Sequence, residues 1–198
     1  MCDNTPMNIT AVHQGEMVGR QVTLDRTEYE LSANGIAWAQ ELASNLRGDH
    51  YTQIYTSHDR PVWQTAGYIR QFHDETPIQF THELSSEHDL SKTTESLRSP
   101  AMIRMLGEAS MGTIMAADRI TNQRVDTFLS RIYRAHTTES VLVVTDAPTV
   151  KAFRRRLFDT IAVQPVVTQN SATEEAYVWW WQFAVPPDGT GRNPKRRK

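Results

Sequence analysis

Apolar and polar positions follow one another in blocks that predict strands and helices in alternation. The clearest block is Ser140–Thr145, a continuous apolar run typical of a strand that is buried on both faces. Shorter strand patterns cover Met7–Val12, Tyr51–Tyr55 and the aromatic segment Ala176–Phe183. Helical spacing predicts a helix capped by Ser32 and ended by Gly48, a helix over Val62–Phe72, a helix from Arg119 onward, and one over Thr149–Phe158. This alternation predicts an α/β fold with a mostly parallel sheet.

Three stretches lack such a pattern. The polar segment that ends at Leu31 reads as a loop, and residues 81–117 read as an irregular helical insertion over the pocket. Its methionines are expected to fill core space rather than bind a ligand. Residues 186–198 contain proline, glycine and basic residues without core formers, so we expect a disordered tail. Residues 1–185 are then expected to form a single domain.

Composition narrows the class of protein. The chain has 198 residues, a formal net charge of −2 and 39% hydrophobic residues, which suffices for a buried core. No apolar run approaches the length of a transmembrane helix, and Met1–Met7 lack the basic start and apolar stretch of a secretory signal, so a cytoplasmic location is expected. A single cysteine, Cys2, excludes an internal disulfide. The near-neutral net charge does not indicate nucleic-acid binding. Only the basic tail, which ends in Lys195, Arg196, Arg197 and Lys198, has the charge for it.

Four segments in a fixed order carry a family resemblance. The first predicted strand is followed by His-Gln-Gly-Glu at residues 13–16; the other three segments are Leu31–Ala39, Ile54–Ala66 and Val141–Pro148. Together they resemble the histidine phosphatase superfamily, which has Arg-His-Gly-Glu at the first segment and Ser-His-Gly-Gly at the last. The resemblance covers residues 7 to about 183. It implies a phosphoglycerate mutase-like, three-layer α/β/α sandwich with a mostly parallel central sheet.

The resemblance also locates the residues of the family's chemistry. In that family one histidine attacks phosphorus, while two arginines and a second histidine hold the phosphoryl oxygens. The nucleophile position is here Gln14, and the first arginine position is His13. The second arginine position falls on Pro61, with Arg60 one residue early, and the second histidine position is Asp146. An amide nitrogen is delocalised and cannot replace the attacking imidazole.

A carboxylate donates the proton to the leaving group in the family. Glu87 lies near the corresponding place in this sequence, and Glu83 competes for the role. For Asp146, a helix N-cap is favoured over a remodelled pocket carboxylate. His82, Glu83, Glu87 and His88 have metal-binding side chains but no recognised ligand spacing, so neither a metal nor a cofactor is expected.

These substitutions lead to three functional hypotheses. The first is a catalytically inactive pseudophosphatase that acts as a binding or regulatory module, with a protein partner, a second copy of the chain or a small anionic ligand. The second is a divergent phosphomonoesterase that uses His13 with Arg60 and with Glu87 or Glu83. The third is a structural subunit of a larger assembly, docked through the strand around Trp179–Trp181 or through the basic tail.

Overall fold

The computed structural model describes residues 7–23, 26–85, 107–136, 138–158, 164–167 and 178–185. Its centre is a six-stranded sheet in the order β5-β4-β6-β1-β8-β7. The strands are β1 Met7–His13, β4 Gln53–Thr56, β5 Ile78–Phe80, β6 Ser140–Thr145, β7 Gln164–Val167 and β8 Val178–Val185. β1, β4, β5 and β6 run parallel, while β8 is antiparallel to both β1 and β7. The prediction of a mostly parallel sheet is therefore confirmed.

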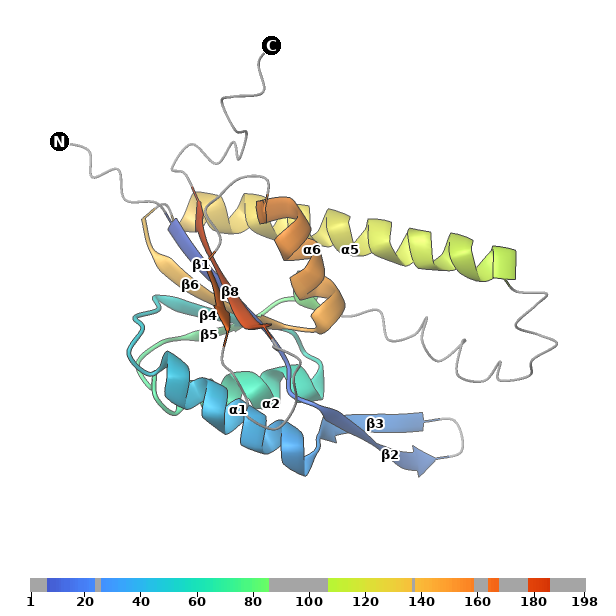
Figure 1. The fold of residues 1–198 in the computed structure, drawn as a ribbon, viewed down its shortest axis with the longest axis horizontal. Helices are drawn as coiled ribbons and strands as arrows, with labels where there is room; N and C mark the ends of the chain where they lie inside the picture. The colour runs from blue at the N-terminus through green and yellow to red at the C-terminus, as the bar shows by residue number, and fades with distance from the viewer. Residues whose placement is uncertain are drawn as a thin grey trace, which may run out of the picture.

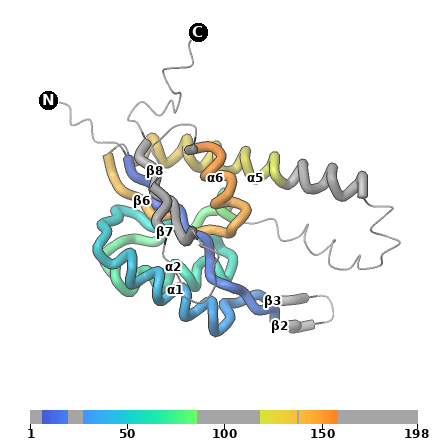
Figure 2. Tube along the Cα trace, in the orientation of Figure 1, coloured from blue at the N-terminus to red at the C-terminus, as the bar shows by residue number. Residues whose placement is uncertain are grey.

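Helices cover both faces of the sheet (Figure 1). α1 (Ala33–Leu46) and α2 (Arg60–Arg70) lie below it in that view, and α5 (Gly107–Ala135) and α6 (Ala147–Phe158) lie above it. The same separation is visible along the Cα trace (Figure 2). The structure is thus the expected three-layer α/β/α sandwich.

The sheet has a hydrophobic core on each face, and the central strands contribute to both because side chains alternate along a strand. Ile9 and Ala11 of β1 pack in the core formed with α5 and α6. Val12 packs in the core formed with α1 and α2, as does Val144 of β6. Both strands are buried on both faces, which explains the continuous apolar run of β6.

A correction concerns the segment before Leu31, which was expected to be a loop. It forms an antiparallel hairpin of β2 (Met17–Thr23) and β3 (Arg26–Leu31), which projects away from the main sheet in Figure 1. No strand was predicted there because polar and apolar residues alternate only over Glu28–Leu31, which is too short a pattern to separate a strand from a loop.

The expected insertion at residues 81–117 also needs correction. α5 begins at Gly107 and runs without a break to Ala135, so the last part of that range belongs to a long helix. A 3-10 turn, η1 (His82–Leu84), lies at its start. Two short strands, β5 and β7, were not predicted. Residues 86–106 and the tail at 186–198 lie outside the described residues.

Candidate functional site

The carboxyl ends of β1 and β6 bring together two residues that the resemblance placed in the site. The parallel register pairs His13 with Thr145, the last residue of each strand. The backbone N–H of Gln14 then donates to the carbonyl oxygen of Thr145 at 2.8 Å. The residue that follows β1 is Gln14 and the residue that follows β6 is Asp146, so both stand at the carboxyl ends of neighbouring strands.

His13 packs against α1. Its ring stacks on Trp38, with 5.0 Å between ring centroids and 21° between ring planes. Its Nδ1 donates to the carbonyl oxygen of Gln14 at 2.7 Å, which leaves the lone pair on Nε2. Burial lowers the pKa of His13, and this hydrogen bond opposes the shift without cancelling it. The imidazole is therefore neutral near pH 7.

Gln14 is held in a tightly packed turn. Its Nε2 contacts Met17 Sδ at 3.7 Å, while its Oε1 is buried without a hydrogen-bond partner in the described structure. The following residue, Gly15, lies so close to α1 that a Cβ there would stand 2.5 Å from the carbonyl oxygen of Gly35. This contact fixes the path of the chain directly after β1.

Asp146 caps α6, as the sequence favoured. Its Oδ1 accepts from the backbone N–H of Thr149 at 2.7 Å, and Pro148 stands in the first turn. Only 3% of the residue is exposed. The cap therefore accounts for one oxygen of a carboxyl group that directly follows β6.

Arg60 is directed toward the hairpin. Its guanidinium lies 3.1 Å from Glu30 and 3.9 Å from Glu28, both on β3. The next residue, Pro61, is buried in the first turn of α2. The cation that the second hypothesis requires at the phosphate position is thus engaged with two carboxylates.

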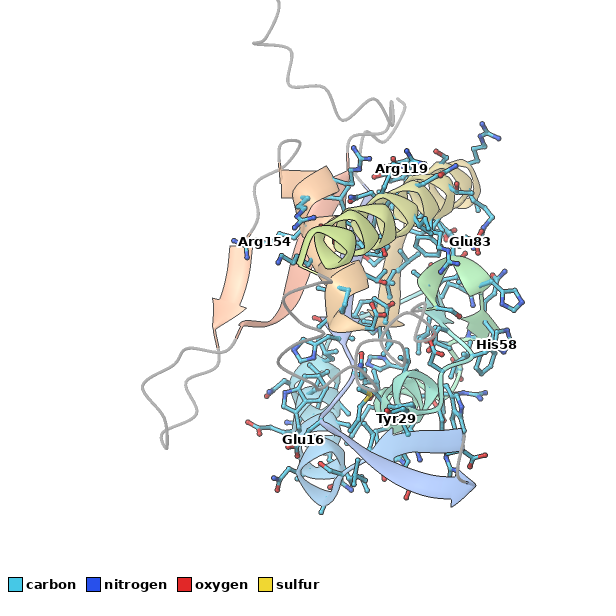
Figure 3. All side chains as sticks on the ribbon, turned by 90° about the vertical axis from the view of Figure 1, so that its right-hand side faces the viewer. Glu16, Tyr29, His58, Glu83, Arg119 and Arg154 are labelled. Carbon is cyan, nitrogen blue, oxygen red and sulfur yellow. The ribbon has the colours of Figure 1, made fainter. Side chains whose placement is uncertain are left out.

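Glu83 is engaged by α5. Arg131 Nε lies 3.3 Å from Glu83 Oε1, and Thr81 Oγ1 donates to the other carboxylate oxygen. Figure 3 shows Glu83 beside α5, with His58 lower on the same side of the molecule. Arg131 also lies over the Tyr55 ring, so Glu83 belongs to an interhelical contact region rather than to the edge formed by Gln14. Glu87, the other candidate proton donor, lies outside the described residues.

The residues considered for metal binding do not form a cluster in the described part of the chain. No group of three or more metal-ligating side chains comes together there. His82 instead lies against His58, with ring centroids 4.9 Å apart. Glu87 and His88 fall in the range that the structure does not describe.

Sequence reasoning missed several polar residues that the fold buries at or near the ends of the strands. Thr56, the last residue of β4, is fully buried and its Oγ1 has no hydrogen-bond partner among the described residues. The sequence signal that could have pointed to Thr56 is a polar residue at the end of a buried strand.

On the other face of the sheet, Tyr55 Oη donates to His136 Nε2 at 2.7 Å, and His136 Nδ1 donates to Glu139 at 2.5 Å. Hydrogen bonds from His136 and Thr52 lower the pKa of Glu139.

The family follows from a comparison of the sequence with family models. The model of the histidine phosphatase superfamily (branch 1) matches residues 15–173. The chain therefore belongs to the histidine phosphatase superfamily, and the resemblance seen in the sequence is confirmed. The match begins at Gly15, directly after His13 and Gln14. A comparison with curated protein sequences finds no match.

Solved structures support the fold. YhfR from Bacillus stearothermophilus superposes with a TM-score of 0.59 at 19% identity, covering 77% of this chain and 80% of that one. A mycobacterial protein described as hydrolase 1 gives a TM-score of 0.55 at 16% identity, covering 76% and 81%. Phosphoglycerate mutase from Bacillus anthracis str. Sterne gives 0.54 at 14% identity, covering 78% and 81%. At these identities the likeness establishes the phosphoglycerate mutase-like fold.

No helix among the described residues combines the length and the apolar character needed to cross a membrane.

Proposed function

We propose that this protein is a catalytically inactive member of its superfamily that acts as a binding or regulatory module through the carboxyl edge of its sheet. The observation that carries the proposal is that Gln14 and Asp146 directly follow the paired ends of β1 and β6, at the positions where the family has its two histidines. A phosphohistidine mechanism needs an imidazole that attacks phosphorus and later leaves. Neither an amide nor a capping carboxylate performs that step.

Electrostatics support the same proposal. A unit charge about 5 Å from a phosphoryl oxygen is worth about 3 kcal/mol at an effective dielectric constant near 20. The family's second histidine position, which would hold a phosphoryl oxygen, carries an aspartate here, and Arg60 is paired with Glu28 and Glu30. Since about 1.4 kcal/mol changes affinity tenfold, a phosphate dianion is expected to bind weakly there.

Hydrolysis of p-nitrophenyl phosphate between about pH 4 and 9 tests the proposal. The parent chain, His13→Ala and His50→Ala are compared; His50 is an exposed histidine outside the site. We expect none of the three to hydrolyse the ester faster than buffer. Hydrolysis that survives in His50→Ala and disappears in His13→Ala would reject the proposal.

One observation favours the second candidate, a phosphomonoesterase that uses His13. The imidazole is neutral, and its Nδ1–H is held by the carbonyl oxygen of Gln14, so the lone pair on Nε2 has the electronic state of a nucleophile. This candidate predicts a phosphorylated His13 peptide after incubation with the phosphate ester and alkaline quenching. Mass spectrometry of the parent and of His13→Ala distinguishes the two functions.

A further inference from the structure

Helix α6 carries a concentration of positive charge. Four of its twelve residues are basic and none is acidic, although the whole chain has a net charge of −2. The four side chains, Lys151, Arg154, Arg155 and Arg156, are all exposed, and Figure 3 labels Arg154 among them. Basic side chains three or four positions apart lie on the same side of a helix and repel one another. An anion that neutralises this charge therefore stabilises the folded chain.

Helix α5 supplies part of the neutralisation. Arg155 lies 3.2 Å from Asp118, and Arg156 lies 2.7 Å from Asp126. Lys151 stands one helical turn before Arg155, and no described residue forms an ion pair or a hydrogen bond with its side chain. The α5–α6 pair thus presents an exposed ammonium group that the described part of the chain does not neutralise.

A groove of about 330 Å³ lies between the two helices. Lys151 and Arg155 line it from α6, and Asp118 and Asn122 line it from α5. Pro148, in the first turn of α6, adds an apolar surface close to the carboxyl end of β6. This volume is at the lower limit of ligand pockets, so the groove has room for one or two side chains.

We propose that the α5–α6 groove is the docking surface for an acidic peptide segment of a protein partner. The inference rests on the binding function proposed above and names the partner class. A glutamate of the partner pairs with Lys151 and Arg155, while its methylene groups contact Pro148 and Ala152. The exposed arginines of α6 attract the rest of the segment and accelerate its association.

The two aspartates of α5 favour a peptide over a nucleic acid. A nucleic acid carries a negative charge at every phosphate, so a strand laid along these helices also brings phosphates to Asp118 and Asp126. A peptide places carboxylates only where cations meet them. Its other side chains and backbone groups then contact the apolar surface of the groove and Asn122.

Fluorescence anisotropy with the full chain tests the proposal with three labelled probes. Oligoglutamate is the acidic peptide, oligothymidylate of equal charge is the nucleic acid, and oligolysine reverses the sign of the charge. We expect oligoglutamate to bind about tenfold more tightly than either of the others, and more weakly as salt screens the charges. No measurable binding of oligoglutamate would overturn the proposal, as would equal or tighter binding of oligothymidylate.

A matched pair of charge reversals locates the binding surface. Lys151→Glu should weaken the binding of oligoglutamate about tenfold, because it reverses a charge in the groove. Arg70→Glu changes the net charge equally, but on an exposed position of α2 across the sheet, and should change the affinity less than about twofold. Equal weakening by both variants, or unchanged affinity in Lys151→Glu, would overturn the proposal.

A third variant should increase the affinity, which misfolding does not do. Asp118→Asn removes the negative charge from the groove and releases Arg155. Both partners of this pair are about half exposed, so folding loses little. We expect oligoglutamate to bind about threefold more tightly. Weaker binding in this variant would overturn the proposal.

The phosphatase assay separates this inference from the function on which it rests. Absence of both peptide binding and ester hydrolysis rejects the docking surface and leaves the non-catalytic function in place. Hydrolysis that depends on His13 rejects the non-catalytic function, whatever the peptide does.

Discussion

At the scale of single residues, the burial of His13 makes folding depend on pH. Burial holds its pKa below the ordinary value of 6.5, so at pH values between the two the unfolded chain binds more protons than the folded one. The contribution of His13 to stability is therefore complete above about pH 6.5 and decreases as the pH falls through this window. His73 is shifted in the same direction, also by burial.

Replacing His13 by phenylalanine should reduce this dependence. The ring still stacks on Trp38, but it no longer takes up a proton in the unfolded chain. We expect the free energy of unfolding to fall less between about pH 7.5 and 5.5 in His13→Phe than in the parent, because one protonation is removed. Urea titrations at the two pH values measure the difference. An identical fall in both proteins would contradict the lowered pKa.

Arg60 gives a second prediction at this scale. Its ion pairs with Glu28 and Glu30 are surface contacts, with about half of the arginine side chain exposed. Exposed pairs contribute little because solvent screens them. Arg60→Ala should therefore lower the free energy of unfolding by less than about 1 kcal/mol. A larger loss in chemical denaturation would show that Arg60 has a role beyond the hairpin contact.

At the scale of elements, the start of α1 is packed directly on the chain after β1. A Cβ at Gly35 would stand 2.1 Å from the carbonyl oxygen of Glu16, which is backbone and cannot move aside cheaply. The N-cap Ser32 fixes the same junction, because its Oγ donates to the Glu16 carboxylate and accepts from the Gly35 N–H. The position of the Gln14 turn thus depends on α1.

Two glycine-to-alanine variants separate this contact from helix propensity. Gly35→Ala should lower the free energy of unfolding by about 1–3 kcal/mol, because the methyl group is forced into backbone. Gly67→Ala on α2 meets nothing within 4 Å and should raise it by about 0.5–1 kcal/mol. Thermal and urea unfolding measure both. Stabilisation by Gly35→Ala would show that the turn after β1 is not packed as described.

A partly buried hydrogen-bonded chain of Tyr55, His136 and Glu139 connects β4 with the segment between α5 and β6. Tyr55→Phe keeps the edge-to-face contact of the ring with Phe128, at 5.2 Å between centroids, and removes the donor to His136. We expect a loss of about 1 kcal/mol in the free energy of unfolding. Tyr68→Phe on α2, outside this chain, serves as the control. Equal effects of the two variants would mean that the Tyr55–His136 bond contributes nothing.

At the scale of the whole molecule, the two cores share the same strands, and we expect them to unfold together. Ile54 lies in the core with α1 and α2, and Ile132 lies in the core with α5 and α6. Ile54→Val and Ile132→Val should each cost about 0.5–1.5 kcal/mol and shift one common transition. Circular dichroism and tryptophan fluorescence should report the same midpoint. Two separate transitions would contradict the single-domain interpretation.

Local sequence patterns predicted those elements whose formation depends on neighbouring residues. The apolar run of β6 and the Asp146-Ala147-Pro148 start of α6 were read correctly, because burial on both faces and N-capping leave direct marks in the sequence. The order of motifs indicated the superfamily. The β2–β3 hairpin was missed, because polar and apolar residues alternate clearly only over Glu28–Leu31 on β3.

The sequence by itself determined the α/β class and the superfamily, and it predicted which residues stand in place of the family's phosphate-binding groups. The tertiary structure decided which of those residues meet. Register places Gln14 and Asp146 at the ends of neighbouring strands, although the two are far apart in sequence, and packing directs Arg60 to the hairpin and Glu83 to Arg131. Such contacts depend on how strands pair and how helices pack across the sheet. These are interactions between distant segments, and no local pattern of hydrophobic and polar positions encodes them.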